Sequence, residues 1–371
     1  MNVIYFGTPD WAIPPLAGLV SKGFQVSMVV TQPDRLTGRK NILTPCAVKS
    51  FALQKNLSVF SPNKIRDLNV FSQIKRQNPD IIIVCAYGQI LPQDLLDHPR
   101  FGSFNIHFSL LPKFRGASPV QASILAGDSN TGISIQKMVM KLDAGPILSE
   151  SKPIKILESD TSRTLGEKLS VHSKNLLLDS IDQILSNKRL IQQDESKATF
   201  CGLIKKEMGR INWIEDTPEL ISRKLRAYDP WPGIYSYDIN GKRINFLEIE
   251  INREQTKQGV IQKDFSIGCR DGSGVVVRHE TKFVRRSGGD AGHDGGHHRL
   301  DLTFCIRGMA EQRLRLPDAP PCWLVRLCRI VQERAMGTLL PDRRQQRVAP
   351  HSSRPGVFHR SAALHGLPNR G

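Results

Sequence analysis

Short apolar runs alternate with amphipathic stretches through the first 190 residues of the chain. The runs that predict central strands of a sheet are residues 2–6, 25–31 and 81–86. The third run is almost continuously apolar, which is typical of a parallel strand covered on both faces. Between the first two, Ala12, Leu16 and Leu19 recur at helical spacing, and Gly23 ends the pattern. This order of elements predicts a Rossmann-like, doubly wound α/β domain.

The pattern predicts further elements along the same half of the chain. They are helices at residues 45–56, 67–78 and 160–186 and a strand at residues 132–138. In the helix at 67–78, Leu68, Phe71 and Ile74 are expected to face inward. Residues 32–44 are polar and are expected to form a loop. No Gly-x-Gly-x-x-Gly pattern follows the first strand, so a dinucleotide is not indicated.

Length and charge limit the class of protein. A chain of 371 residues is long enough for two or three domains. Its net charge of +17 is typical of a protein with an anionic partner such as nucleic acid. The charge is uneven, because residues 281–371 hold sixteen Lys and Arg against seven Asp and Glu. Of these sixteen bases one is Lys, whereas the preceding sequence is rich in Lys, Ile and Asn.

The change of composition begins at about Arg278 and continues to the last residue. We interpret this basic Arg-, Gly-, Pro- and His-rich tail as foreign to the rest of the chain, as a different reading frame or a fused segment would produce. The alternative is a natural basic extension that is disordered and binds RNA.

The composition indicates a cytoplasmic protein. Charged residues make up 23% of the chain, and no apolar run reaches the ~20 residues of a transmembrane helix. The first predicted strand begins one residue after Met1, which leaves no room for a signal or transit peptide. The cysteines in the first 280 residues show neither paired nor metal-ligand spacing, so reduced thiols and no bound metal are expected.

The most informative stretch for chemistry is GSFNIHFSLLP, residues 102–112. Phe104 and Ile106 alternate with Asn105 and His107, so on a strand the two polar side chains share one face. A carboxamide beside an imidazole can hold a carbonyl group and stabilise the oxyanion that forms from it. A half-buried strand with a hydrated polar face shows the same alternation, so spacing alone leaves both interpretations open.

The surrounding motifs favour the chemical interpretation. Asn-x-His, Ser-Leu-Leu-Pro, Arg-Gly-Ala-Ser-Pro and Leu-Asp-x-Gly follow one another between residues 105 and 145, and IYFGTPDWA stands near the start. In this order and at this spacing they resemble the folate-dependent formyltransferases, most closely the methionyl-tRNA formyltransferase family. The resemblance runs from Met1 to about residue 277.

The resemblance implies an enzyme that transfers the formyl group of 10-formyltetrahydrofolate to the amino group of initiator methionyl-tRNA, for translation initiation. It implies that Asn105 donates to the oxyanion, that His107 stabilises charge or relays a proton, and that Asp143 orients the histidine. From the residues alone, Asp143 is equally well explained as a turn residue. The amine is a competent nucleophile, since a free α-amino group has a pKa of about 8. Neither a metal nor an acyl-enzyme is expected.

The resemblance also implies a folate site. Its expected residues are Tyr87, Gly88, Ser109, Leu110, Leu111 and Pro112. The first two follow the predicted strand at 81–86, and the carboxyl end of a central strand is where ligands bind in open α/β sheets. The other four form the folate-contacting turn of the family. From the residues alone, Tyr87 is equally a packing residue and the turn an ordinary connection between a strand and a helix.

The polar segment at residues 32–44 carries Arg35, Arg39 and Lys40. Guanidinium and ammonium groups bind nucleic acids by neutralising phosphates and releasing counterions. In the resembled family this loop meets the acceptor arm of the tRNA, so these three residues are expected to bind tRNA. A solvated surface loop is the simpler alternative.

A second unit with short alternating strands follows a polar linker. Asn240-Gly241 between apolar runs is a strong hairpin signal, and AYDPWPG at residues 227–233 resembles the family's OB-like (oligonucleotide-binding-like) carboxyl-terminal barrel. Trp231 is interpreted as a structural anchor rather than a base-stacking platform. The last strand and the Lys-rich closing segment of that barrel do not appear, so the barrel is expected to be incomplete.

The predicted domain boundaries combine these patterns. They are a catalytic domain at residues 1–189, a linker at 190–206, an OB-like tRNA-binding domain at 207–280 and the tail at 281–371. The resemblance implies a monomer.

Other functions stay open at this stage. Formyltransferases that act on small amines, and formyltetrahydrofolate hydrolases, share Asn105, His107 and Asp143 but not the basic loop or the PWPG segment. A basic RNA-binding protein with a vestigial catalytic domain is a different class, and the complete catalytic set argues against it. A third possibility is an enzyme crippled by the replaced end of its second domain.

Overall fold

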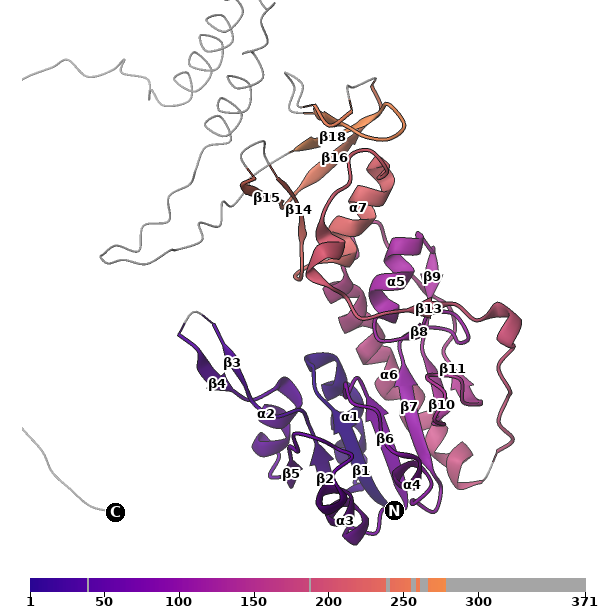
Figure 1. The fold of residues 1–371 in the computed structure, drawn as a ribbon. Coiled ribbons are helices and arrows are strands. Elements are labelled where there is room, and N and C mark those ends of the chain that lie inside the picture. The colour runs from indigo at the N-terminus through magenta and orange to yellow at the C-terminus, as the bar shows by residue number, and fades with distance from the viewer. Residues whose placement is uncertain (39, 187, 238–240, 255–257, 261–265, 278–371) are drawn as a thin grey trace, which may run out of the picture. The chain divides into compact units, whose positions relative to one another are not determined.

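The computed structural model describes residues 1–277 except 39, 187, 238–240, 255–257 and 261–265 (Figure 1). The expected foreign tail, and the expected missing strand of the barrel, therefore lie outside the described residues. Within the part that is described, no helix is long and apolar enough to cross a membrane.

A seven-stranded sheet organises the first half of the chain (Figure 1). Its strands, in spatial order, are β11 (Ile147–Glu150), β10 (Ser134–Lys137), β7 (Ser103–His107), β6 (Ile81–Cys85), β1 (Asn2–Gly7), β2 (Gln25–Val30) and β5 (Val59–Phe60). The five strands from β7 to β5 are parallel, and β10 and β11 run antiparallel at one edge. The chain builds outward from β1 in one direction and then in the other, so the switch in strand order lies between β1 and β6. The predicted doubly wound domain is confirmed, with an antiparallel edge added.

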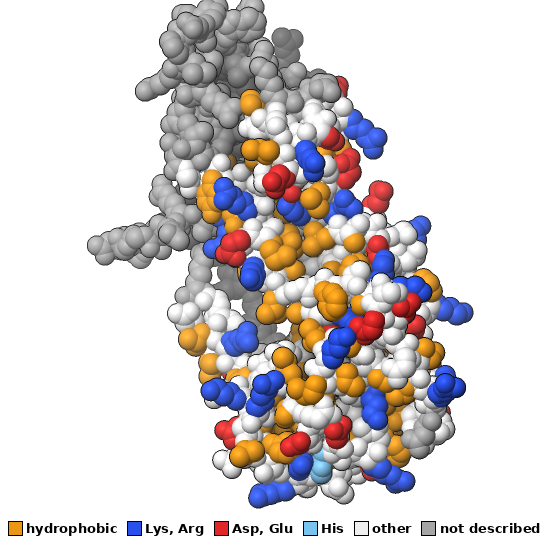
Figure 2. Space-filling model, turned by 45° about the vertical axis from the view of Figure 1, so that its right-hand side comes forward, with side chains coloured by type: hydrophobic (Ala, Val, Ile, Leu, Met, Phe, Trp, Pro, Cys, Tyr) orange, Lys and Arg blue, Asp and Glu red, His pale blue; other side chains and the backbone are white. Residues whose placement is uncertain are grey.

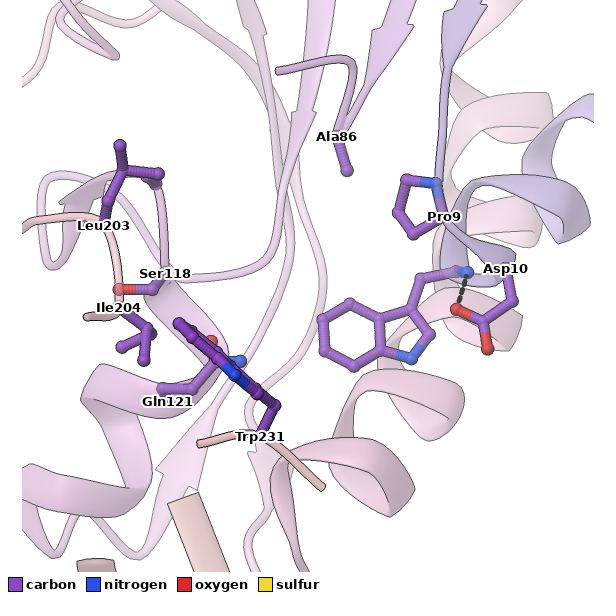
Figure 3. A pocket seen from close by; sticks show the side chains of 10 residues that line it. Pro9, Asp10, Ala86, Ser118, Gln121, Leu203, Ile204 and Trp231 are labelled. Atoms are coloured by element: carbon purple, nitrogen blue, oxygen red, sulfur yellow. Dashed lines mark hydrogen bonds between the residues drawn. The ribbon is translucent and has the colours of Figure 1, made fainter. Parts of the chain in front are cut away.

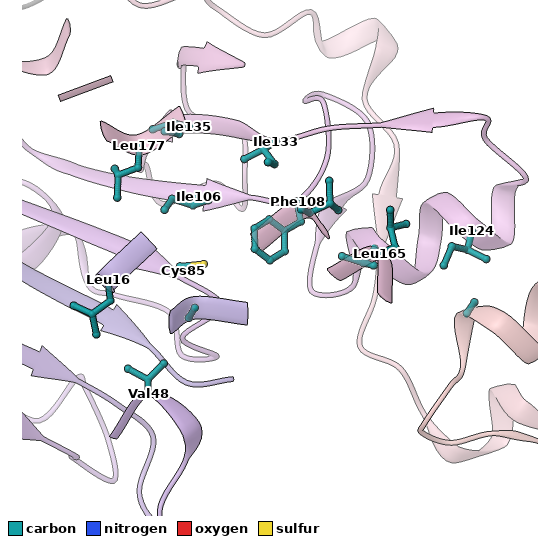
Figure 4. Close-up of a cluster of buried hydrophobic side chains, with 14 of the residues drawn as sticks. Leu16, Val48, Cys85, Ile106, Phe108, Ile124, Ile133, Ile135, Leu165 and Leu177 are labelled. Carbon is teal, nitrogen blue, oxygen red and sulfur yellow. The ribbon is translucent and has the colours of Figure 1, made fainter. Parts of the chain in front are cut away.

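Helices cover both faces of this sheet because its strands alternate between two cores. Val3 and Tyr5 of β1 face one hydrophobic cluster, whereas Ile4 and Phe6 face the other. The helices are α1 (Ile13–Ser21), α2 (Ala47–Gln54), α3 (Leu68–Arg76), α4 (Gln93–Leu96), α5 (Pro119–Ala126) and α6 (Ser162–Leu185). The first cluster includes residues of α1, α2, α5 and α6, and the second includes residues of α3 and α4. Figure 4 shows part of the first cluster.

The expected inward stripe of α3 is only partly correct. Ile74 is fully buried and Phe71 is partly buried, but Leu68 is 79% exposed. Because 3.6 residues make one turn, residues six positions apart do not share a face of a helix. Leu68 is also the first residue of the helix, directly after Asp67, whose side chain accepts from the N–H of Asn69.

The segment at residues 32–44 is a β-hairpin and not the expected loop. Its strands are β3 (Arg35–Thr37) and β4 (Ile42–Thr44), which pair antiparallel with Leu36 opposite Leu43. Asp34 at its base forms a 2.8 Å ion pair with Lys49 of α2. The two strands are exposed, so cross-strand pairing, rather than burial, holds the hairpin in shape.

The second unit is a small β domain with one helix, α7 (Pro218–Ala227). Its strands are β14 (Ile234–Tyr237), β15 (Arg243–Phe246), β16 (Ile249–Asn252), β17 (Ser266–Gly268) and β18 (Gly274–Val277). The hairpin expected from Asn240-Gly241 is confirmed by the antiparallel pairing of β14 with β15, although Asn240 itself is outside the described residues. A three-stranded sheet follows in the order β16-β18-β17.

Shorter elements connect these units. They are the strands β8 (Arg115–Gly116), β9 (Asn130–Thr131), β12 (Ile154–Lys155) and β13 (Phe200–Cys201) and the 3₁₀ turns η1 (Asp10–Ala12), η2 (Glu195–Lys197) and η3 (Lys206–Gly209). The pairing of β8 with β13 matters most, because it lays the segment after α6 along the segment that follows β7.

Candidate active site

Strand β7 holds Asn105 and His107 rigidly, since it pairs with β6 on one side and with β10 on the other. Phe104 and Ile106 point into the hydrophobic cluster on one face, as the alternation predicts. The two polar side chains share the other face. In the register of β7 and β10, Gln136 lies directly opposite Asn105 on that face.

Asp143 completes the group from the loop that connects β10 to β11. Its carboxylate accepts from the Gly116 N–H at 2.9 Å, from Gln136 Nε2 at 2.8 Å and from Asn105 Nδ2 at 3.3 Å. The loop can pass this close only with glycine at position 145, where a Cβ atom would lie 1.7 Å from the Lys137 carbonyl oxygen. The structure therefore brings together the three expected catalytic residues. The Asp143 carboxylate accepts three hydrogen bonds, which a residue that only forms a turn would not need.

His107 is buried, with 5% of its surface exposed. Its Nδ1 lies 3.7 Å from Asp143 Oδ2, which is longer than a hydrogen bond. Its Nε2 lies 2.9 Å from the Phe114 carbonyl oxygen. Because a carbonyl oxygen only accepts, this nitrogen carries a proton and donates it. A substrate oxygen would compete with that carbonyl for the same N–H group.

The four residues of the expected folate turn directly follow β7. The side chains of Ser109 and Leu111 are buried, and Ser109 Oγ donates to the Lys113 carbonyl at 2.5 Å. Leu110 and Pro112 are partly exposed. A ligand at this turn would thus meet Leu110, Pro112 and backbone groups rather than the serine hydroxyl.

Tyr87 and Gly88 lie at the carboxyl end of β6, as expected. The Tyr87 side chain is buried and packs edge-on against Phe6, with ring centroids 5.1 Å apart. Burial raises the pKa of its hydroxyl to about 12. Tyr87 is thus a packing residue, and its backbone carbonyl accepts from the Thr8 hydroxyl and from Gln32 Nε2 at the carboxyl end of β6. Gly88 has a φ of +90°, a conformation that favours glycine.

Four residues join the site that the sequence patterns did not single out: Arg115, Gln136, Gln193 and Glu195. Gln136 lies on the strand predicted at 132–138. The pairing of that strand with β7, which places Gln136 opposite Asn105, could not be predicted from the sequence pattern. Arg115 lies inside a recognised motif that gave it no role. Gln193 and Glu195 stand in the polar linker, where no periodicity or motif marks them.

Among the described residues, no hydrogen bond or ion pair joins Arg35 or Lys40 of the hairpin to this group. Arg35 and Lys40 are exposed, and Arg39 lies outside the described residues. Within the described part of the chain, no cluster of three His, Cys, Asp or Glu residues is arranged to hold a metal ion.

A cleft of ≈ 390 Å³ opens at the carboxyl ends of β1 and β6, where the strand order switches. Figure 3 shows Ser118, Gln121 and Trp231 on one side of it and Pro9, Asp10 and Ala86 on the other. Trp11, Ala117, Leu203 and Ile204 complete the lining. Asn105, His107 and Asp143 are not among these lining residues. Ala117, one of the lining residues, directly follows Gly116, whose N–H donates to the Asp143 carboxylate.

The interpretation of Trp231 as a structural anchor was wrong. Its side chain is 56% exposed and lines the cleft. The buried anchors of this segment are instead Tyr228 and Ile234, which flank it on either side.

Known proteins share both halves of this architecture. Residues 1–181 match the family model described as formyl transferase, and residues 203–284 match the formyl transferase C-terminal domain. The methionyl-tRNA formyltransferase of Bacillus velezensis is 42% identical over 244 residues, which make up 66% of this chain and 76% of that protein. The chain belongs to the methionyl-tRNA formyltransferase family. The member of this family from Lysinibacillus sphaericus is 42% identical over 283 residues, 74% of this chain and 90% of that protein.

A solved structure supports the same fold. WlaRD, a sugar 3N-formyltransferase whose structure was determined with dTDP and 5-N-formyl-THF, superimposes with a TM-score of 0.53. The match covers 75% of this chain and 97% of that one at 19% identity. The resemblance that the motifs carried, to a folate-dependent formyltransferase with an amino-terminal α/β domain and a small carboxyl-terminal β domain, is thus confirmed.

Proposed function

We propose that this protein transfers the formyl group of 10-formyltetrahydrofolate to the α-amino group of initiator methionyl-tRNA, with Asn105, His107 and Asp143 as its catalytic residues. The observation that carries the assignment is that Asn105 and His107, side by side at the end of a central strand, both face the Asp143 carboxylate, at 3.3 and 3.7 Å. Family membership supports the reaction and both substrates.

The chemistry follows from the hydrogen-bonding capacity of the three side chains. The neutral amine attacks the formyl carbon, a C–N bond forms and the carbonyl oxygen becomes an oxyanion. Asn105 has two amide N–H groups, of which one donates to Asp143, so the other is available to the oxyanion. When the bond to the folate nitrogen breaks, the proton lost by the amine passes to that nitrogen, and His107 is the group placed to relay it.

Two exposed features supply sites for the remaining parts of the substrates. The cleft has a mostly apolar lining that includes two tryptophans, Trp11 and Trp231, and this lining suits the apolar methionyl side chain at the end of the tRNA. The hairpin of β3 and β4 presents Arg35 and Lys40, with Arg39 between them in sequence, to the phosphates of the acceptor arm.

Four further statements remain part of the proposal. The catalytic and tRNA-binding domains occupy residues 1–189 and 207–280, and residues 190–206 connect them. The folate binds beside Tyr87, Gly88 and the turn from Ser109 to Pro112. The protein acts as a monomer, which its mass in solution would test, and it works in the cytoplasm.

The deciding experiment substitutes His107→Ala and measures formylation of methionyl-tRNA. A positioned side chain that relays a proton typically contributes on the order of a hundredfold or more to the rate, so kcat should fall at least about a hundredfold. Folate binding, followed by titration of the variant, should change little. His172→Ala is the matched control, because His172 is exposed on α6. Turnover close to that of the unmodified protein would remove His107 from the mechanism.

A further inference from the structure

The segment between the two domains lies against the catalytic residues. Thr199 Oγ1 accepts from the Phe114 N–H at 2.8 Å, and β13 pairs with β8 so that Cys201 lies opposite Gly116. Phe114 provides the carbonyl that binds His107, and Gly116 the N–H that binds Asp143. The predicted linker is therefore a part of the wall behind the active site.

Gln193 makes the most direct contacts of this segment. Its Nε2 lies 2.6 Å from the Gly145 carbonyl oxygen and 2.9 Å from the Asp143 carbonyl oxygen, so its amide spans the catalytic loop. The same nitrogen lies 3.3 Å from Oε1 of Gln136, the side chain whose Nε2 donates to the Asp143 carboxylate. Gln193 thus supports Asp143 both at its backbone and through its neighbour.

Arg115 fixes which way the Gln193 amide points. The guanidinium is fully buried, and its Nε and Nη2 donate to Gln193 Oε1 at 3.0 and 2.8 Å. Because arginine only donates, the amide must turn its oxygen to Arg115 and its NH₂ group to the catalytic loop. The buried charge is balanced by Glu195, whose carboxylate accepts from Nη1 and Nη2 at 3.1 and 2.9 Å.

We propose that Gln193 is a positioning residue for formyl transfer, supplied to the catalytic domain by the segment between the domains and oriented by Arg115 and Glu195. This inference rests on the proposed function, since it concerns the alignment of Asp143. It makes the catalytic geometry depend on a segment that the catalytic domain's own strands and helices do not contain.

The test replaces Gln193→Leu in the full chain and measures kcat and KM for methionyl-tRNA. We expect kcat to fall at least tenfold, with KM within twofold of the value for the unmodified protein. A misaligned Asp143 carboxylate affects the chemical step rather than the binding of tRNA. Gln192→Leu is the matched control, since Gln192 is the exposed neighbour in the same segment. An unchanged kcat for Gln193→Leu would overturn the proposal.

A double-mutant cycle with Asp143→Asn separates positioning from a general structural role. Where the carboxylate is already removed, Gln193→Leu should change kcat less than twofold. A second tenfold loss in that background would assign Gln193 to structure alone and overturn the inference.

Full activity of Asp143→Asn by itself would instead refute the catalytic assignment of the proposed function, whatever Gln193 does. If Gln193→Leu fails to fold, the same cycle is run with Glu195→Gln, for which a smaller but equally non-additive loss is expected.

Discussion

At the scale of single residues, the site depends on an ion pair with very unequal surroundings. The Arg115 guanidinium has no exposed surface, whereas the Glu195 side chain is 56% exposed and also bonds Lys141 at 2.8 Å. A fully buried cation without its partner is costly, but the partner itself loses little hydration because water still reaches it. Glu195 therefore contributes to stability mainly by satisfying Arg115.

This imbalance predicts how acid acts on the protein. Hydrogen bonds from Arg115, and then from Lys141, lower the pKa of the Glu195 carboxyl from 4.5 to about 2. A group whose pKa is depressed in the folded state stabilises the fold above its unfolded pKa, and this contribution is lost as the pH falls through the folded value. Solvent screening of the exposed carboxylate will reduce the effect.

We expect Glu195→Gln to lower the melting temperature at pH 7, and the difference from the unmodified protein to shrink as the pH falls from 4.5 to about 2. Thermal unfolding followed by circular dichroism across this range provides the measurement. Lys141→Met is the control, since Lys141 is 65% exposed and touches Glu195 but not the buried guanidinium. A difference that is constant with pH would contradict the assigned role of the pair.

At the scale of elements, the sequence patterns predicted what local periodicity encodes. The alternation of Phe104 and Ile106 with Asn105 and His107 correctly placed the two polar side chains on one face of a strand. The register that sets Gln136 beside Asn105 was not predictable, because it depends on the pairing of two strands about thirty residues apart. The contacts of Gln193 were hidden for the same reason, since an irregular segment carries no period. The hairpin at 35–44 was missed because each of its strands is only three residues long and exposed, which is too short for a period-two alternation to be recognised.

The hairpin yields a prediction of its own. Removing its charges with Arg35→Ala, Arg39→Ala and Lys40→Ala should raise KM for methionyl-tRNA several-fold and leave kcat at saturation unchanged. The dependence of log(kcat/KM) on log[salt] should flatten by about 0.7–0.9 for each phosphate that the variant no longer neutralises. Steady-state kinetics at several salt concentrations provide the measurement. Arg76→Ala, an exposed arginine at the end of α3, should change neither quantity. If the triple variant showed the same salt dependence as the unmodified protein, the three basic residues would not contact the tRNA phosphates.

At the scale of the whole molecule, charge alone does not locate the partner. Figure 2 shows basic side chains mixed with acidic and apolar ones over the face that it presents. The family-model match ends at residue 284, and residues 285–371 beyond it, with fifteen Arg against seven Asp and Glu, carry +8 of the net charge of +17. A basic tail outside the family sequence thus supplies nearly half of the charge that first suggested nucleic acid. The specific case for tRNA rests on the hairpin, the cleft and the family.

This division predicts that the tail is dispensable. A chain that ends at Val277, after β18, and one that ends at Val284, where the family match stops, should both formylate methionyl-tRNA with kcat and KM within twofold of the full chain. Their salt slopes should equal that of the full chain if the tail, as we interpret it, takes no part in binding the tRNA. If only the chain ending at Val284 is active, the seven residues between the two ends complete the second domain.

Activity confined to the full chain would mean that the tail closes that domain or binds the RNA, and it would refute the interpretation of the tail as foreign. Loss of activity in every chain, with folate still bound, would indicate a folded catalytic domain whose second domain no longer holds the tRNA.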